Sequence, residues 1–323
     1  MEPSSIPIGR LAPSPTGAQH LGNARSYLLA WASIRQRNGG IIFRIEDIDS
    51  PRVKPWAVRQ AMDDLAWLGL NWDEGPDVGG PSGPYIQTQR CALYTNAISR
   101  LRALNQVYPC VCTRRDIEDA ASAPHESIDG PVYPGTCSMW NEGDPLPEIG
   151  SFCWRFRVRD SHQSFTDDVS GAQSMNPARS LGDFPVTRKS GEAAYQLAVV
   201  VDDIAMGVTD VLRGNDLLPS TFRQLELYRA MKHPPPRFAH VPLVRGADGR
   251  RLAKRHGDTR LSYFREQGCK PESIVGWSAW SAGIIDRWEL LSPSELLSVF
   301  DLQKVRLADT LVDQDTYLRL MTM

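Results

Sequence analysis

The sequence predicts an α/β fold built on a parallel sheet. An apolar run at residues 6–11 breaks at two prolines and a glycine, and the segment 23–38 then carries apolar residues at helical spacing. Gly39 and Gly40 are expected to stop that helix. The compact apolar run at 41–45 predicts a buried strand. Strand, helix and strand in this order form a β-α-β unit, in which the two strands run parallel.

The rest of the chain continues in a similar way. Helices are expected at 56–68, 89–105 and 221–231, and strands at 152–158 and 197–201. Residues 110–150 are rich in Pro, Gly, Ser and Cys and show little periodicity, so we expect an insertion there. After residue 257 the chain becomes helical: Pro271 should open one helix, and Ser292-Pro-Ser-Glu295 has the capping-box pattern of another.

The composition is that of an ordinary globular protein. Of 323 residues, 41% are hydrophobic and 23% are charged, and the net charge is −2, so a nucleic-acid partner would have to bind a local basic patch. Residues 1–7 do not have the pattern of a signal peptide, and no apolar run is long enough to span a bilayer. Six irregularly spaced cysteines do not indicate a secreted disulfide framework. We therefore expect a cytoplasmic protein without a membrane partner.

The segment Arg10-Leu-Ala-Pro-Ser-Pro-Thr-Gly-Ala-Gln-His20-Leu-Gly-Asn23 is the most informative part of the chain. A strand, a tight turn and a helix N-terminus are how parallel α/β proteins build a phosphate site. The turn has neither a G-x-G-x-x-G nor a G-K-[ST] pattern, which argues against a dinucleotide site and a P-loop. Taken alone, the segment also fits an ordinary Pro/Gly loop before a helix.

Further segments follow in an order that is specific. They are Arg44-Ile-Glu-Asp-Ile-Asp49, Tyr195-Gln-Leu-Ala-Val-Val-Val-Asp-Asp203, Gly207-Val-Thr-Asp-Val-Leu-Arg-Gly214 and Arg251-Leu-Ala-Lys-Arg-His-Gly257. From about Gly9 to Gly257, the chain resembles the catalytic domain of class I glutamyl-tRNA synthetases. The Arg10–Asn23 segment looks like their HIGH motif, and the last segment looks like their KMSKS motif.

The resemblance implies a Rossmann-like parallel-sheet catalytic domain with a zinc-binding insertion and a short C-terminal helical module. The expected boundaries are 1–108 for the first half of the catalytic domain, 109–150 for the insertion, 151–257 for the second half and 258–323 for the helical module. ATP would be a substrate, with Mg²⁺. His20, Gly22, Asn23 and Lys254 are the residues expected to bind it.

His20 and Lys254 are the expected catalytic residues. A neutral imidazole at a helix N-terminus can donate a hydrogen bond to a phosphate, and the helix dipole favours that anion. Asn23 stands where the family has a second histidine, and it still offers a hydrogen-bond donor. Lys254 would close over the phosphates from a basic loop, in which Ala253 replaces the family's serine. Seen singly, His20 would be a surface-loop histidine and Lys254 part of a solvated charge cluster.

Glutamate carries two carboxylates and one ammonium group, so a selective site should offer two cations and one anion. By resemblance, Arg10 and Arg213 hold the carboxylates, Glu46 holds the amino group and Tyr195 lines the pocket. The residues expected to complete it are Leu11, Ala12, Pro13 and Ser14. Which arginine takes which carboxylate is left open. Alternatively, Glu46 is a helix-cap carboxylate and Tyr195 a half-buried strand aromatic.

Cys110-Val-Cys112 and Tyr133-Pro-Gly-Thr-Cys137 indicate a metal site. Three thiolates and a fourth ligand make a closed, structural Zn²⁺ site. In the family the fourth ligand is a tyrosine oxygen, which here is that of Tyr133, and His125 is a competitor. The alternative is three buried free cysteines. The other cysteines, Cys91, Cys153 and Cys269, are interpreted as isolated residues of the core or surface.

Roughly seventy residues follow Lys254, which is too few for the family's anticodon-binding region. We therefore expect a monomeric paralogue that activates glutamate before any tRNA arrives. The resemblance to a paralogue of the family that lacks this region implies that the acceptor is the queuosine base of tRNA(Asp). The alternatives are a short glutamyl-tRNA synthetase that charges the 3′ end of a tRNA, a non-catalytic tRNA-binding paralogue and a small nucleotidylyltransferase.

Overall fold

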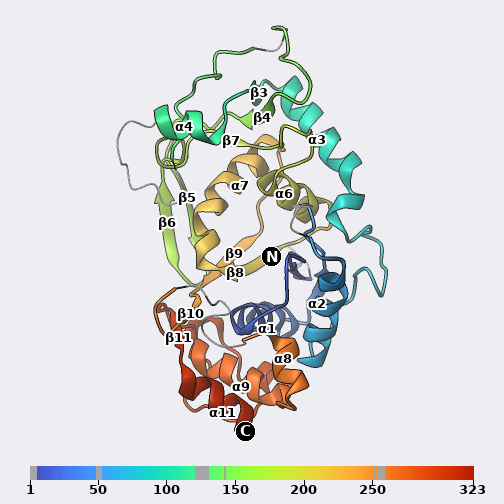
Figure 1. Ribbon diagram of the computed structural model, residues 1–323, viewed down its shortest axis with the longest axis vertical. Coiled ribbons are helices and arrows are strands. Elements are labelled where there is room, and N and C mark those ends of the chain that lie inside the picture. The colour runs from blue at the N-terminus through green and yellow to red at the C-terminus, as the bar shows by residue number, and fades with distance from the viewer. Residues whose placement is uncertain (1–5, 49–52, 121–130, 142, 251, 253–258) are drawn as a thin grey trace, which may run out of the picture.

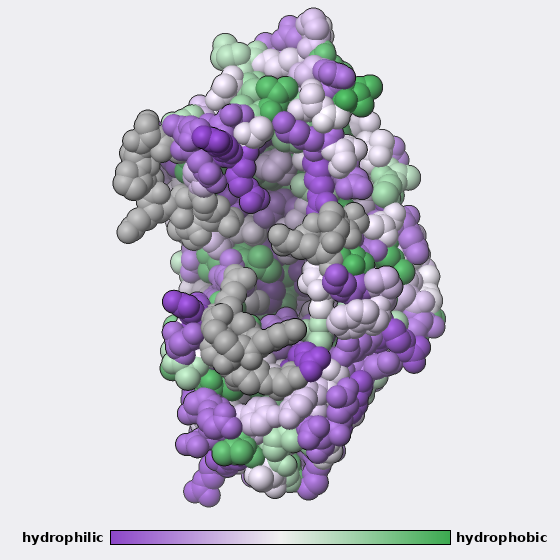
Figure 2. Space-filling model, viewed as in Figure 1, coloured by the Kyte–Doolittle hydropathy of each residue, from purple (hydrophilic) through white to green (hydrophobic). Residues whose placement is uncertain are grey.

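The computed structural model describes residues 6–48, 53–120, 131–141, 143–250, 252 and 259–323. The molecule is elongated (Figure 1). Strands β8 and β9 lie near mid-height, the β3–β4–β7 region lies at one end, and helices α9 and α11 lie at the other end with the C-terminus. The face turned to the viewer is hollowed near mid-height (Figure 2).

The expected β-α-β unit opens the fold. Strand β1 (Ile8–Leu11) pairs in parallel with β2 (Gly40–Phe43), and helix α1 (Leu21–Arg35) connects them. Strand β8 (Asp210–Gly214) begins beside β1, where Thr209 N donates to Ile8 O at 2.9 Å. The carboxyl ends of β1 and β8 therefore meet at one edge, which is where ligands bind in open α/β sheets.

Strand β8 lies beside β1 and belongs to a separate four-stranded sheet, which is mixed. Strand β9 (Arg237–Val241) is parallel to β8, and β5 (Gln163–Asp167) is parallel to β9. Strand β6 (Gly171–Met175) is antiparallel to β5 and closes this edge. The predicted parallel arrangement is therefore confirmed for the strands at the centre, with an antiparallel strand added outside them.

Helices cover both faces of the sheet. Side chains of β2 alternate between two cores: Ile41 and Phe43 join the core formed with α1, whereas Ile42 joins the other. The second core contains residues of α3 (Cys91–Ala103), α6 (Tyr195–Ala205) and α7 (Leu218–Ala230). Together with α2 (Pro55–Trp67), α3 and α7 confirm the helices predicted at 56–68, 89–105 and 221–231.

The strand predicted at 197–201 is wrong, because these residues lie inside helix α6. Leu197 to Val200 are fully buried, and α6 packs against both α3 and α7. An apolar run buried on all sides has no polar face, so its periodicity cannot distinguish a helix from a buried strand. The run belongs to an eleven-residue helix that also carries Asp202 and Asp203.

The glycine stop predicted for α1 is also wrong in detail. The helix ends at Arg35, and Asn38 takes the left-handed conformation with φ 55°. Gly40 is already the first residue of β2. A Cβ at Gly39 would lie 2.4 Å from the carbonyl oxygen of Pro7. Gly39 therefore allows a close backbone approach and does not supply the left-handed turn.

The insertion begins as part of a small antiparallel sheet. Strands β3 (Val107–Cys110), β4 (Cys153–Phe156) and β7 (Phe184–Pro185) form it in that order, which confirms the strand predicted at 152–158. Helix α4 (Arg114–Ala120) follows β3. Shorter elements elsewhere are α5 (Pro177–Ser180) and the 3₁₀ turns η2 (Gln87–Gln89), η3 (Asn215–Leu217) and η5 (Leu302–Lys304).

The C-terminal module contains α8 (Leu261–Glu266), α9 (Pro271–Ala282), α10 (Pro293–Val299) and α11 (Gln314–Thr322). The helix start at Pro271 and the capping box of Ser292 with Glu295 are confirmed. The module is not purely helical, because β11 (Thr310–Val312) pairs in parallel with β10 (Val244–Gly246). This pairing attaches the module to the catalytic part of the chain.

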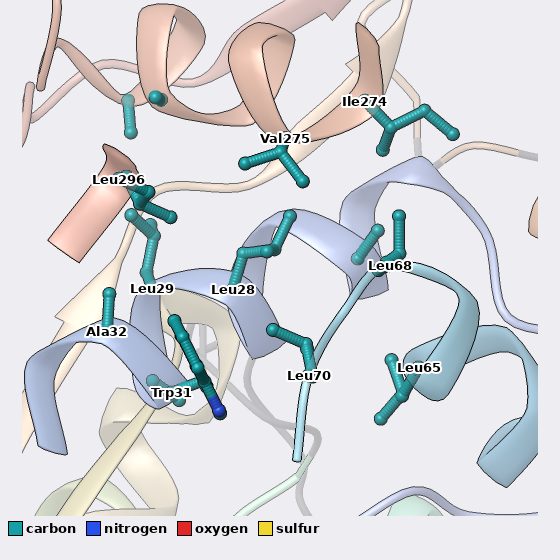
Figure 3. Close-up of a cluster of buried hydrophobic side chains, with 14 of the residues drawn as sticks. Leu28, Leu29, Trp31, Ala32, Leu65, Leu68, Leu70, Ile274, Val275 and Leu296 are labelled. Carbon is teal, nitrogen blue, oxygen red and sulfur yellow. The ribbon is translucent and has the colours of Figure 1, made fainter. Parts of the chain in front are cut away.

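Helix α1 is held between the sheet and this module (Figure 3). Leu28 and Leu29 face Val275 of α9 and Leu296 of α10. Burying one such side chain contributes about 1.5–3 kcal/mol. The N-terminus of α1, where His20 is the N-cap residue, therefore belongs to a helix that is packed on both sides.

A second contact joins the module to α2. Asp64 of α2 is fully buried, and its Oδ1 lies 3.4 Å from Nη1 of Arg265 in α8. Burial raises the pKa of Asp64 to about 6. None of the described helices is both long enough and apolar enough to cross a membrane.

Candidate active site

A cavity of about 330 Å³ lies at the carboxyl ends of β1 and β8, beside the N-terminus of α1. It brings together eight of the predicted residues, which are Arg10, Ala12, His20, Gly22, Asn23, Glu46, Tyr195 and Arg213. The sequence analysis did not single out several other lining residues, among them Ser26, Tyr27, Asp216, Leu243, Val244 and Leu252. The cavity therefore joins residues from both halves of the chain.

Three predicted residues are not among the described residues that line this cavity. Leu11 is buried in the core with α1. The carbonyl of Pro13 accepts a hydrogen bond from Glu46 N at 3.0 Å, so the turn after β1 holds the backbone at Glu46. Ser14 is exposed. Lys254 lies outside the described residues.

His20 caps helix α1. Its ring Nδ1 accepts a hydrogen bond from Gly22 N at 3.1 Å, and its backbone N–H donates to Asn23 Oδ1 at 3.2 Å. Burial lowers the pKa of His20, which favours the neutral ring. Because Nδ1 is an acceptor, the neutral ring carries its proton on Nε2. This leaves an N–H donor on His20 and the amide NH₂ of Asn23 for an anion beside the helix N-terminus.

Described residues on either side of Lys254 lie near this cavity. Leu252 lines the cavity on one side of it. On the other side, Thr259 O accepts a hydrogen bond from Leu21 N at 3.1 Å. Leu261 N in turn donates to Gln19 O at 2.9 Å. The described residues that flank Lys254 in the sequence therefore lie near the predicted phosphate site.

A buried ionic network supports Glu46. Arg44 is fully buried and donates to Glu46 Oε1 at 2.9 Å and to Asp203 Oδ1 at 2.7 Å. Burial lowers the pKa of Arg44, but the charges of Asp203, Glu46 and Asp202 outweigh it and raise the pKa. The sequence analysis assigned no role to Arg44, Asp202 or Asp203. A signal was present in the Arg-x-Glu spacing, which places both side chains on one face of an extended segment.

Asp202 extends this network away from the cavity. It accepts hydrogen bonds from Arg90 Nε at 2.6 Å, Gln87 Nε2 at 2.9 Å and the Tyr94 hydroxyl. Its partners come from η2, α3 and the residue between them. The last turn of the apolar helix α6 therefore carries two carboxylates, Asp202 and Asp203, which are both buried and both paired with cations.

The two predicted arginines differ in their surroundings. Arg10 Nε lies 3.4 Å from Asp203 Oδ1 and so already has an anionic partner. Arg213 donates to four neutral acceptors. Nη2 donates to Thr221 Oγ1 at 2.8 Å, to Gln224 Oε1 at 2.9 Å and more weakly to Leu217 O at 3.4 Å, and Nε donates to His240 Nε2 at 3.1 Å.

Arg213 has one donor left over. Within the described part of the chain it forms no ion pair, and its buried Nη1 has no hydrogen-bond partner. Burial lowers the pKa of Arg213, because a desolvated cation is costly without a counter-charge. A carboxylate in the cavity would provide both the missing charge and the missing acceptor.

Tyr195 is the first residue of α6, so the alternative interpretation as a strand aromatic is wrong. Burial raises the pKa of Tyr195 and that of Tyr27, which also lines the cavity. Both phenols are therefore neutral at physiological pH. Each offers a hydroxyl that can donate to a substrate oxygen.

The predicted metal ligands lie together in the insertion. The Sγ atoms of Cys110, Cys112 and Cys137 lie within 4.8 Å of one another. The Tyr133 hydroxyl is 3.4 Å from Cys110 Sγ and 3.7 Å from Cys112 Sγ. A tetrahedral zinc site with Zn–S bonds of about 2.3 Å places its sulfurs about 3.8 Å apart. The set fits such a site, and the competitor His125 lies outside the described residues.

Cys153 is not isolated, contrary to its interpretation from the sequence. It stands opposite Cys110 in the β3–β4 register. Hydrogen bonds from Cys153 and then from Tyr133 lower the pKa of the Cys110 thiol, with a further contribution from Arg155. The Arg155 guanidinium also lies 3.9 Å from the Tyr133 ring centre. These contacts favour the thiolate, which is the form that binds a metal. Cys269 is a core residue and Cys91 is exposed, as expected.

Comparison with known proteins agrees with this geometry. Residues 8–313 match the family model of class I tRNA synthetases (E and Q), catalytic domain. The match covers nearly the whole chain, and the chain therefore belongs to this family of ligase-type enzymes.

Three relatives and one solved structure are similar to this chain over most of its length. A glutamyl-Q tRNA(Asp) synthetase of Rhodopirellula baltica is 59% identical over 87% of this chain and 86% of the relative. A protein of the same name from Symbiobacterium thermophilum is 50% identical over 92% and 93%. A glutamate–tRNA ligase of Anaeromyxobacter sp. is 40% identical over 96% of this chain but 65% of the relative. The glutamate-tRNA synthetase structure from Elizabethkingia anophelis has a TM-score of 0.84 at 28% identity, covering 98% of this chain and 70% of that one.

Proposed function

We propose that this protein activates L-glutamate with ATP, without tRNA, and transfers the glutamyl group to the queuosine base of tRNA(Asp). The observation that carries the choice of glutamate is Arg213, a buried cation with a free donor and only neutral partners. The choice of acceptor rests on the two relatives named glutamyl-Q tRNA(Asp) synthetase, which this chain matches over most of their length.

In the first step the α-carboxylate of glutamate attacks the α-phosphorus of ATP. The bond from that phosphorus to the bridging oxygen breaks, and pyrophosphate leaves with the electron pair. Glu46, held by Arg44 at 2.9 Å, accepts hydrogen bonds from the glutamate ammonium group. Arg10 and Arg213 hold the two carboxylates, with Tyr195 and Ala12 beside them.

The phosphates of ATP, with Mg²⁺, lie against the N-terminus of α1. The Nε2–H of His20 donates to a phosphate oxygen, and Gly22 and Asn23 provide the adjoining surface. Lys254, which is flanked in the sequence by described residues near this region, neutralises the charge that develops as pyrophosphate departs. The donors at the N-terminus of α1 are held in place before the reaction by the cap of His20 and Asn23, so they need little reorganisation in the transition state.

In the second step a hydroxyl of the cyclopentene diol of queuosine attacks the carbonyl carbon of the adenylate. AMP leaves with the electron pair, and the hydroxyl proton is released. Zn²⁺, bound by Cys110, Cys112, Cys137 and Tyr133, would hold the insertion together and take no part in either step. Strand β3 and helix α4 lie at the end of the molecule opposite the C-terminal module (Figure 1), and there the insertion can contact the tRNA.

Two assays test the proposal. ATP–pyrophosphate exchange without tRNA should depend on glutamate among a panel of amino acids; exchange driven by another amino acid alone would refute the substrate. Labelled glutamate should then be transferred to tRNA(Asp) that carries queuosine, and not to the same tRNA without it or to tRNA(Glu). Preferential charging of tRNA(Glu) would favour a short glutamyl-tRNA synthetase instead.

A further inference from the structure

Behind Arg213 lies a pair of fully buried side chains that the mechanism above does not use. Asp167 ends β5 and His240 lies in β9, where it stands opposite Arg213 of β8 in the parallel register. His240 Nδ1 is 2.6 Å from Asp167 Oδ2, and His240 Nε2 is 3.1 Å from Arg213 Nε. Three neighbouring strands thus carry a continuous chain of hydrogen bonds to the cavity.

The chemistry of the two ends determines the protonation of the ring between them. A carboxylate only accepts hydrogen bonds, so the proton of His240 must lie on Nδ1. Nε2 is then an acceptor, which is what the Nε–H of Arg213 requires, and the Thr221 hydroxyl, whose Oγ1 is also 3.1 Å from Nε2, can donate to it as well. The other tautomer would place two N–H groups face to face at 3.1 Å. Burial lowers the pKa of His240, and the neutral ring is therefore maintained.

We propose that Asp167 and His240 are positioning residues for glutamate recognition: through the tautomer of the imidazole they fix Arg213 so that its Nη1 stays available to a substrate carboxylate. The proposal rests on the function proposed above and adds the reason why Arg213 has a free donor. Nε and Nη2 are both occupied by His240, Thr221 and Gln224, so the guanidinium cannot turn to satisfy Nη1 within the described protein.

The surroundings of Asp167 make the idea testable with an isosteric change. Oδ1 accepts hydrogen bonds from three backbone N–H groups: Ser170 at 2.8 Å, His240 at 3.0 Å and Val169 at 3.1 Å. In Asp167→Asn the amide oxygen should remain at this position, because the three donors need an acceptor. The amide NH₂ would then occupy the place of Oδ2 and donate to His240 Nδ1. The ring proton would move to Nε2, opposite Arg213.

Asp168→Asn is a matched control. It makes the same chemical change one residue along, where the carboxylate pairs with the exposed Arg237 at 2.9 Å. Glutamate-dependent ATP–pyrophosphate exchange is measured for both variants, with KM for glutamate, KM for ATP and kcat determined separately. Thermal unfolding of each variant reports whether the fold is kept.

Asp167→Asn should raise KM for glutamate about 10- to 100-fold, the scale of one lost hydrogen bond to a charged group. KM for ATP should stay within about twofold, since a binding defect confined to one substrate leaves the other unaffected. Asp168→Asn should resemble the wild type. An unchanged KM for glutamate in folded Asp167→Asn, or an equal rise in both KM values, would overturn the proposal.

A second pair of variants, both at His240, tests the same proposal if Asp167→Asn fails to fold. His240→Gln retains a carbonyl acceptor that can reach Arg213 Nε, whereas His240→Leu removes the acceptor at similar volume. KM for glutamate should be nearly normal in the first variant and raised in the second; equal values in both would contradict the positioning role. Wild-type protein without glutamate-dependent exchange would instead refute the proposed function, so the two failures are distinguishable.

Discussion

Replacing Arg44 by Met removes the cation that holds the acidic side of the cavity. The side chain lies at 2.9 Å from Glu46, 2.7 Å from Asp203 and 3.9 Å from Asp202, and all four residues are buried. Methionine fills most of the same volume without the charge. The perturbation therefore tests electrostatics with little change in packing.

The three carboxylates differ in the ion-pair partners that they keep when Arg44 is replaced. Asp202 retains Arg90 at 2.6 Å, and Asp203 retains Arg10 at 3.4 Å. Glu46 forms no other ion pair within the described part of the chain. Breaking a buried pair on one side costs about 3–5 kcal/mol, and here the loss should fall mainly on Glu46. We expect the free energy of unfolding to fall by that amount.

Urea unfolding, followed by circular dichroism, measures this loss directly, and glutamate-dependent exchange measures the effect on the site. KM for glutamate should rise, because an unpaired Glu46 is no longer held toward the substrate ammonium group. Arg59→Met is the control, since Arg59 pairs with Asp63 at the surface of the same catalytic half. A loss below about 1 kcal/mol, the scale of a surface pair, would refute the reasoning.

Three further predictions concern other parts of the molecule. Arg213→Lys should lower kcat/KM for glutamate about 10- to 100-fold in exchange assays, because a lysine ammonium group cannot keep the hydrogen bonds of Arg213 to its neutral neighbours and also donate to the substrate carboxylate. Arg237→Lys, an exposed control, should leave kcat/KM unchanged. Cys112→Ser should lose about one zinc per chain by metal analysis while keeping some glutamate activation, whereas Cys91→Ser should retain the metal; a wild-type protein without zinc would contradict this. Burial raises the pKa of Asp64 from 3.8 to about 6, so its contribution to stability is fully present below its unfolded pKa and is lost as the pH rises through 6. In urea unfolding, Asp64→Asn should therefore gain on the wild type between about pH 4 and pH 7 and hold a constant difference above that; parallel curves for the two proteins between about pH 4 and pH 7 would show that the carboxyl does not titrate there.

Local sequence was sufficient for the first part of the site. Residues 8–43 contain strand, turn, helix and strand, and their patterns predict the β-α-β unit with His20 at the helix N-terminus. Arg10 and His20 are close in sequence to the elements that place them. Side chains at strand ends and helix starts meet at the edge of a parallel sheet whatever the distant chain does.

Local sequence was insufficient where burial decided the conformation. The apolar run of α6 has no polar face, and only its packing between α3 and α7 makes it a helix. The same holds for Cys153, which is far from Cys110 in sequence but adjacent across β3 and β4. Periodicity reports which face is exposed, so it is silent for a segment that is buried all round.

By itself, then, the sequence determined the fold class, the family resemblance and the kinds of charged group that the cavity contains. Only the tertiary structure decided how those charges are paired. Arg44 and Asp203 are 159 residues apart and lie 2.7 Å from each other, whereas Arg213 is surrounded by neutral acceptors. The physical reason is that a buried charge takes its energy from whatever lies within a few ångströms, and the identity of those neighbours depends on long-range contacts that no local pattern encodes.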